Sequence, residues 1–337
     1  NRKATISVDY IALLNETSAT VPENDRAWPL YRDAGIALRK NPEPSSFSED
    51  MYDDMDAPTW PDQAGWEYYK TWIDSHVQTL DTIHRAAAMD GMGYVLVGMI
   101  AEEDKELWPD QYASQKDLDQ SDEFFFSVLT PQFGPMRAMA RFLSIDAKNA
   151  AFNGDIERCL SDIEMMLAIG THVREHPLLI SDLISFSIYK IAFLTLHEIM
   201  EHDSSLFSLE QLDEFARVLL GLEKNLTIRF DGERLFFLNF LQRVYTDNGN
   251  GDGSIIPNEF ANMISQLEIT SSFESSSLVL SLVAPIADMH FASRKEMLVE
   301  LNRRFAFFEK QQLEVHSETA NDNQFIGLPW ASATSVM

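Results

Sequence analysis

The sequence predicts an all-α fold, an irregular array of helices with little or no sheet. Apolar residues recur at the three- and four-residue spacing of a helix face through most of the chain. No segment alternates apolar and polar residues for long enough to build a sheet. With 337 residues, of which 45% are hydrophobic, the chain can bury a large core.

Residues 1–62 are predicted to form short helices and an acidic loop. Two short helical patterns occupy the first forty positions, and the second begins near Pro22. Residues 43–62 are rich in Pro and Asp and contain no Lys or Arg, which is typical of a solvated loop. We expect residues 63–330 to be the main helical domain and to form one compact unit with residues 1–62.

The main domain begins with a helical pattern at Gln63. Its aromatic residues lie at helical spacing, which favours a place in the core over a carbohydrate-binding platform. These residues are Trp60, Trp66, Tyr68, Tyr69 and Trp72. A short extended piece is expected over Tyr94 to Met99.

Two helices joined by a tight turn are predicted between Met136 and Pro177. The first breaks at Asn153-Gly154-Asp155, and the second carries the only cysteine, Cys159, among apolar residues. We interpret Cys159 as a buried thiol. The arrangement looks like a tetratricopeptide-type hairpin, although no repeat of about 34 residues supports an array.

Four further helices complete the predicted fold. Leu178–Met200 is strongly apolar but contains Asp182 and Lys190, so it is interpreted as a buried core helix and not as a membrane span. A helix over 208–226 begins with Ser208 and Gln211 in the pattern of a capping box. Two more are expected over about 233–245 and 285–314.

The charge of the chain excludes some partners. Lys and Arg number 26 against 53 Asp and Glu, which gives a net charge of −27. Such a chain repels nucleic-acid phosphates and anionic lipid heads, so we expect no nucleic-acid partner and no binding to a membrane surface.

One segment, residues 248–259, resembles a single calcium loop of the EF-hand type. Such a loop gathers oxygen ligands from alternate positions, with Gly at the sixth position and Glu at the twelfth. Here Gly253 and Glu259 occupy these positions, Asn248, Asn250 and Asp252 occupy the first, third and fifth, and Ser254 would offer its carbonyl oxygen. Phe260, Met263, Ile264 and Leu267 would continue as the apolar stripe of an exiting helix. The alternative is a Gly- and Asn-rich turn that binds no ion.

A second motif offers a catalytic alternative. His172, Glu175 and His176 fit the H-x-x-E-H pattern of one class of zinc peptidases. The two histidines would hold zinc and Glu175 would serve as general base. Pro177 places His176 at the end of the helix, which favours a polar helix terminus instead.

The whole chain resembles an uncharacterised bacterial family of exported or membrane-tethered helical proteins. The residues that carry this resemblance are Asp25-Arg26-Ala27-Trp28-Pro29, Asn153-Gly154-Asp155 and Tyr245-Thr246-Asp247-Asn248-Gly249. It implies an exported location, periplasmic or extracellular, and no activity. An N-terminal signal or anchor removed before Asn1 would agree with it. We therefore expect a non-enzymatic helical protein with one calcium ion, which binds a protein or glycan partner; the alternative is a zinc-dependent hydrolase.

Overall fold

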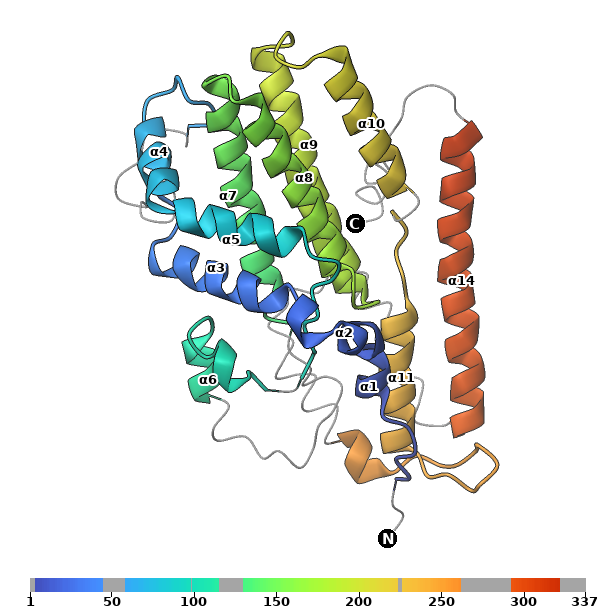
Figure 1. Cartoon of the computed structure of the whole chain (residues 1–337). Helices are drawn as coiled ribbons and strands as arrows, with labels where there is room; N and C mark the ends of the chain where they lie inside the picture. Colours follow the sequence, from blue (N-terminus) through green and yellow to red (C-terminus); the bar gives the residue numbers. More distant parts are fainter. Residues whose placement is uncertain are drawn as a thin grey trace. The chain divides into compact units, whose positions relative to one another are not determined.

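The computed structural model describes residues 4–44, 58–97, 99–114, 130–223, 226–261 and 292–321 (Figure 1). Within these ranges the regular secondary structure is helical. The only β-type pairings in the described residues are two isolated bridges, Arg26 with Gly91 and Tyr245 with Ile255. The predicted all-α class is confirmed, whereas the tetratricopeptide-like character of its hairpins stays a prediction.

The chain divides into two compact units, and the division differs from the predicted boundary at residue 62. Among the described residues, the first unit combines residues 4–14 with residues from Thr227 onward. The second contains the described residues from Asn15 to Leu226. The N-terminal residues thus belong with helices that come more than two hundred positions later, a long-range association that local periodicity cannot reveal.

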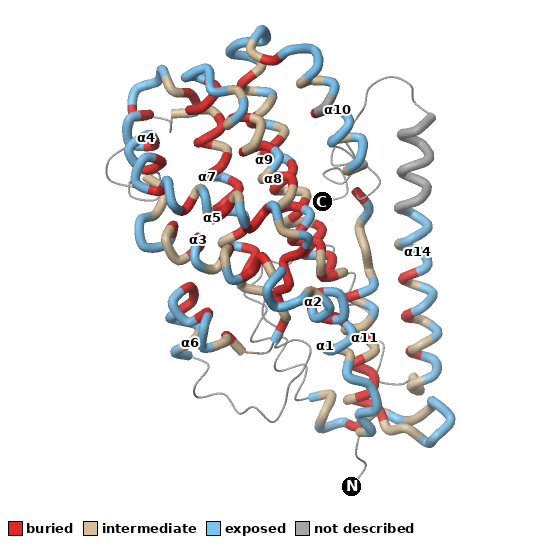
Figure 2. The backbone as a smooth tube through the Cα atoms, in the orientation of Figure 1, coloured by how far each residue is buried: buried red, intermediate tan, exposed pale blue. Residues whose placement is uncertain are grey.

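The second unit is a bundle built around three long helices. Its helices are α2 (Glu16–Thr20), α3 (Trp28–Lys40), α4 (Trp66–Ser75), α5 (Val77–Ala87), α6 (Pro109–Ser114), α7 (Phe133–Phe152), α8 (Ile156–Val173), α9 (Leu179–His202) and α10 (Leu209–Glu223), with short 3-10 turns at Glu23–Asp25 and Glu102–Asp104. Helices α7, α8 and α9 pack against one another, and their facing residues form the centre of the buried core (Figure 2).

The turn between α7 and α8 confirms the predicted helical hairpin. Gly154 adopts the left-handed conformation, with φ of 74°, which favours glycine. The carboxylate of Asp155 then accepts the amide of Arg158 at 3.2 Å and caps α8. Cys159 is buried as predicted, and burial raises the pKa of its thiol to about 12.

Other predicted elements are confirmed in part. Ser208 and Gln211 form the predicted capping box, with bonds of 2.9 and 3.2 Å between each main-chain amide and the other residue's side chain. Of the predicted aromatic cluster, only Tyr68 is exposed, at 46%; the other members are buried in the core.

The helical pattern predicted from Gln63 forms two helices, α4 and α5, which are separated by a break at His76. The described part of the predicted extended segment, residues 94–97, forms no strand.

The first unit is described through α1 (Tyr10–Leu14), α11 (Asp231–Val244) and α14 (Arg294–Asn321). Its core joins one face of α11 to one face of α14 and consists of Phe237, Phe240, Leu241, Val244, Tyr245, Met297, Leu301 and Phe305. Residues 285–291 of the predicted last helix lie outside the described residues.

Candidate functional site

The segment after α11 forms a short hairpin. Tyr245 and Ile255 form its antiparallel bridge. The amide of Thr246 donates to the carbonyl oxygen of Ser254 at 3.0 Å, and the amide of Ser254 donates to Thr246 Oγ1 at 3.0 Å. The Ser254 carbonyl, predicted as a calcium ligand, therefore already accepts a main-chain hydrogen bond.

The predicted ligands Asn248, Asn250 and Asp252 lie in the turn of this hairpin. Asn248 Oδ1 accepts the amides of Asn250, at 2.9 Å, and of Asp252, at 3.4 Å. The chain reverses through Gly249 and Gly251, whose φ angles are 84° and 76°. The structure brings the three residues together, with the side-chain oxygen of Asn248 directed to the main chain.

Gly253 is required here for a reason that the calcium-loop pattern does not state. A Cβ atom at this position would lie 1.9 Å from the carbonyl oxygen of Thr246. No side chain fits such a close approach, because the obstructing atom belongs to the opposite main chain of the hairpin. The left-handed turns occur instead at Gly249 and Gly251.

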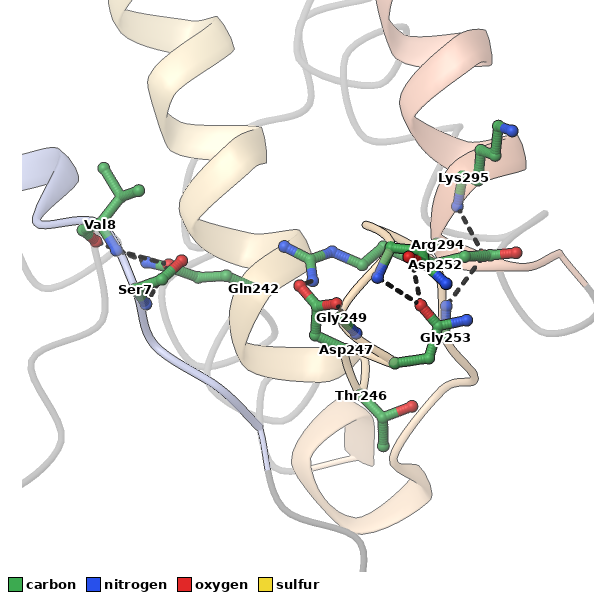
Figure 3. Close-up of polar contacts among 12 residues, drawn as sticks. Ser7, Val8, Gln242, Thr246, Asp247, Gly249, Asp252, Gly253, Arg294 and Lys295 are labelled. Atoms are coloured by element: carbon green, nitrogen blue, oxygen red, sulfur yellow. Dashed lines mark hydrogen bonds and ion pairs between the residues drawn. The ribbon is translucent and has the colours of Figure 1, made fainter.

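The hairpin is attached to the first turn of α14 (Figure 3). Asp252 Oδ1 accepts the amide of Lys295 at 3.1 Å, and the carbonyl oxygen of Gly253 accepts the amide of Arg294 at 3.1 Å. The guanidinium of Arg294 forms an ion pair with Asp247. The two hydrogen bonds satisfy the Arg294 and Lys295 amides, which lie at the beginning of α14 and have no acceptor within the helix.

Both carboxylates of the hairpin are held in the ionised form. The Lys295 amide, followed by the Gly253 amide, lowers the pKa of Asp252. The Gly249 amide and the guanidinium of Arg294 lower the pKa of Asp247. Hydrogen bonds to a carboxylate stabilise its charged form, which is also the form that a cation requires.

Glu259, the predicted ligand at the twelfth position, lies in a helical segment over residues 257–261. Met263, Ile264 and Leu267 lie outside the described residues. Among the residues that are described, no three His, Cys, Asp or Glu side chains converge in a metal-ligand arrangement. The hairpin places Asn248, Asn250 and Asp252 in one turn, and calcium binding there stays a prediction.

Gln242, on α11, holds the N-terminal residues and was not identified from the sequence. Its Oε1 accepts the amides of Ser7 and Val8, each at 3.2 Å, and its Nε2 donates to the carbonyl oxygen of Val8 at 2.8 Å (Figure 3). Asn239 Oδ1 accepts from the same Nε2 at 2.9 Å and fixes the amide. A side chain that pairs with main chain in this way has no local sequence pattern.

His172 of the second motif is a structural histidine in this fold. Helix α8 ends at Val173, so His176 lies beyond the helix. His172 Nδ1 lies 2.8 Å from Tyr31 Oη, and its Nε2 lies 2.9 Å from the carbonyl oxygen of Met89. The carbonyl can only accept, so Nε2 carries the proton and Nδ1 accepts from Tyr31. Neither nitrogen then offers a lone pair to zinc.

The other two residues of this motif meet Ser18 of α2. Ser18 Oγ donates to Glu175 Oε2 at 3.0 Å and lies 3.0 Å from His176 Nε2. The amide of Gly93 donates to the same Glu175 oxygen at 2.8 Å. In a serine-hydrolase triad the acid binds the histidine and not the serine. Ser18 and His176 are both fully buried, so this is an internal network that joins α2 to the turn before α9.

A buried carboxyl pair between α7 and α8 was also missed. Asp146 accepts two hydrogen bonds from Arg158, at 2.8 and 2.6 Å, and Asp162 Oδ1 lies 2.7 Å from His84 Nε2 of α5. Both carboxyl groups are fully buried. Burial, and then repulsion by Asp146, raises the pKa of Asp162 well above its usual range. Acidic residues on the apolar faces of the two predicted helices were the signal for this pair.

One surface hollow of about 530 Å³ lies on the second unit. Charged side chains of α3 and of the segment around residue 104 line most of it. Four of these charged residues already form two ion pairs, since Lys105 contacts Glu102 and Arg32 contacts Asp33 at 3.3 Å. The hollow contains none of the predicted site residues.

Comparison with protein families, with curated proteins and with solved structures gives no match to this chain.

Proposed function

We propose that this chain is a non-enzymatic helical protein with a binding or scaffold role, in which the hairpin 245–256 is a structural corner between α11 and α14. The observation that carries the proposal is the use of Asp252, whose carboxylate bonds the first turn of α14. The motif residues that catalysis would require are likewise engaged in internal bonds: His172 with Tyr31, and Glu175 with Ser18.

Calcium binding at this corner is part of the proposal. Asn248, Asn250, Asp252, the Ser254 carbonyl and Glu259 are all oxygen donors, the chemistry that calcium prefers. In the hairpin, Asp252 and Ser254 already accept main-chain amides, so an ion must compete with the bonds to Lys295 and Thr246. This competition and the small number of charged ligands support weak binding, with a Kd on the order of 0.1–1 mM.

An exported location and a protein or glycan partner belong to the same proposal. The resemblance to exported helical proteins supports the location. Calcium at extracellular concentrations would suit a site of such low affinity. The net charge of −27 disfavours nucleic acid and anionic membranes as partners.

Isothermal titration calorimetry with calcium tests the proposal. We expect one weak site in the wild-type chain and its loss in Glu259→Gln. Because a chain of this charge attracts cations generally, Glu210→Gln on α10 serves as the matched control and should bind like the wild type. Absence of heat at millimolar calcium, or equal loss in both variants, would refute a site at the hairpin.

A further inference from the structure

Helix α9 carries large apolar residues on its outer face as well as on its buried face. Its buried positions are Leu179, Ile188, Tyr189, Ala192 and Ile199, together with Ser181, Asp182, Ser185 and Thr195. Its outer face carries large aliphatic residues: Ile180 is 42% and Leu194 is 48% exposed. A surface helix of a monomer normally turns such residues inward. An apolar face directed outward in this way is typical of an interaction surface.

The outer residues form one continuous stripe along α9. Ile180, Leu183, Ile184, Ser187, Ile191 and Leu194 follow one another at helical spacing, and each is exposed or half-buried. We call this set the α9 stripe. Between Ile180 and Leu194, Lys190 at its edge is the only charged residue that is exposed. Asp182 is turned inward, where it pairs with Arg174 at 3.1 Å.

The spacing of the stripe is symmetric about Ser187. Ile180 and Leu194 lie seven positions on either side of it, and Leu183 and Ile191 lie four positions on either side. If two copies of α9 cross antiparallel about a two-fold axis at Ser187, Ile180 meets Leu194 and Leu183 meets Ile191 of the other copy, while Ile184 meets the aliphatic stem of Lys190 at the edge. The small side chain at the centre lets the helices approach closely. A surface that is complementary to itself is what a two-fold dimer requires.

A lipid bilayer fits the same face less well. Among the described helices, α9 alone is long and apolar enough to cross a membrane, but 44% of its apolar window is buried within the chain. Its inner face also carries the ion pair between Asp182 and Arg174. A net charge of −27 also repels anionic headgroups.

We propose that the α9 stripe is the dimerisation surface of this protein and that its partner is a second copy of the chain. One helix pair buries less area than a standard stable interface, so the dimer should dissociate on dilution, with a Kd on the order of 10 µM. Because the two copies repel each other electrostatically, raising the salt concentration should strengthen their association.

Sedimentation equilibrium of the full chain, at concentrations from about 1 to 100 µM, tests this proposal around the expected Kd. Leu194→Arg should weaken the dimer by at least about tenfold, because each dimer then places two charges in the apolar contact. Val77→Arg is the matched control: Val77 is 60% exposed on α5 of the same unit and should leave the dimer unchanged. Far-UV circular dichroism confirms that both variants fold.

A cross-link tests the symmetry separately. Ser187→Cys should form a disulfide between two copies under mild oxidation, because only residues near the axis come within bonding distance. Val77→Cys should not, and the buried Cys159 should contribute none. A wild-type chain that is monomeric throughout would overturn the proposal. So would a dimer that Leu194→Arg does not weaken, or a monomer that binds neutral lipid vesicles through this face.

Discussion

Asp252 accepts a hydrogen bond from the main-chain amide of Lys295, 43 positions later in the sequence. This bond, with that from the Arg294 amide to the Gly253 carbonyl oxygen, attaches the turn of the hairpin to the first turn of α14. The carboxylate that a calcium loop would use for its ion therefore has a structural task as well.

Replacing Asp252 by Ala should loosen the beginning of α14. Hydrogen exchange at the Lys295 amide should become faster by about twofold to tenfold, as expected for the loss of one hydrogen bond. Asn250→Ala is the control, since Asn250 is a predicted calcium ligand whose side chain does not bond Lys295. It should weaken calcium binding and leave that amide protected. Equal hydrogen-exchange rates at the Lys295 amide in the two variants would show that Asp252 has no structural role there.

Gly253→Ala should destabilise the chain more than Gly251→Ala. The added Cβ of the first would lie 1.9 Å from the Thr246 carbonyl oxygen, whereas that of the second meets nothing within 4 Å. We expect a cost of about 3 kcal/mol or more for Gly253→Ala, because the main chain must shift. The left-handed backbone alone costs about 1–2 kcal/mol in Gly251→Ala. Urea unfolding of both variants measures the difference, and a reversed order would contradict the hairpin geometry.

The buried carboxyl pair of Asp146 and Asp162 should make the free energy of unfolding fall as the pH rises. The folded chain keeps Asp162 protonated at pH values where the unfolded chain has released that proton. The folded state thus binds more protons, and the free energy of unfolding decreases with pH, by up to about 1.4 kcal/mol per unit. Measurements above pH 7 avoid the opposite effect of His84, whose pKa is lowered mainly by burial.

Asp162→Asn should remove most of this decline between pH 7 and 9 in urea unfolding. Asp81→Asn is the control, because the Asp81 side chain is 70% exposed. It should keep the wild-type slope. A slope unchanged in Asp162→Asn would show that Asp162 is ionised in the folded protein.

His172→Ala should lower stability and leave metal content unchanged. The substitution removes a buried ring and leaves Tyr31 Oη without its acceptor, at a cost of about 2–4 kcal/mol. His197→Ala, whose side chain is 66% exposed, should change stability by less than about 0.5 kcal/mol. Elemental analysis of the wild-type protein after dialysis should give no stoichiometric zinc. Tightly bound zinc that His172→Ala releases would restore the hydrolase alternative.

The features that the sequence predicted well depend on residues close together in the chain. The capping box of Ser208 and Gln211 and the turn at Gly154 are examples, because three or four positions contain all the interacting groups. The Gly- and Asn-rich turn at residues 248–254 was placed for the same reason. Its pattern could not distinguish an ion-binding loop from a hairpin, since both require glycine at position 253.

The features that were missed depend on contacts distant in sequence. Gln242 holds Ser7 and Val8 from more than two hundred positions away, and the N-terminal residues consequently belong to the same unit as α11. Likewise, Asp162 receives its environment from Asp146 on α7 and His84 on α5. No periodicity within one helix contains that information.

Thermal unfolding with and without calcium tests the central claim most directly. The claim is that one calcium ion stabilises the hairpin of a protein that is already folded without calcium. Calcium that binds only to the folded state stabilises it by about 1.4 kcal/mol when the free calcium concentration is ten times Kd. This raises the Tm by about 1–3 °C for a chain of this size. We predict that rise in millimolar calcium, a smaller one in magnesium, and none in the double variant Asp252→Asn/Glu259→Gln. An unchanged wild-type Tm, or a rise of tens of degrees, would contradict the account.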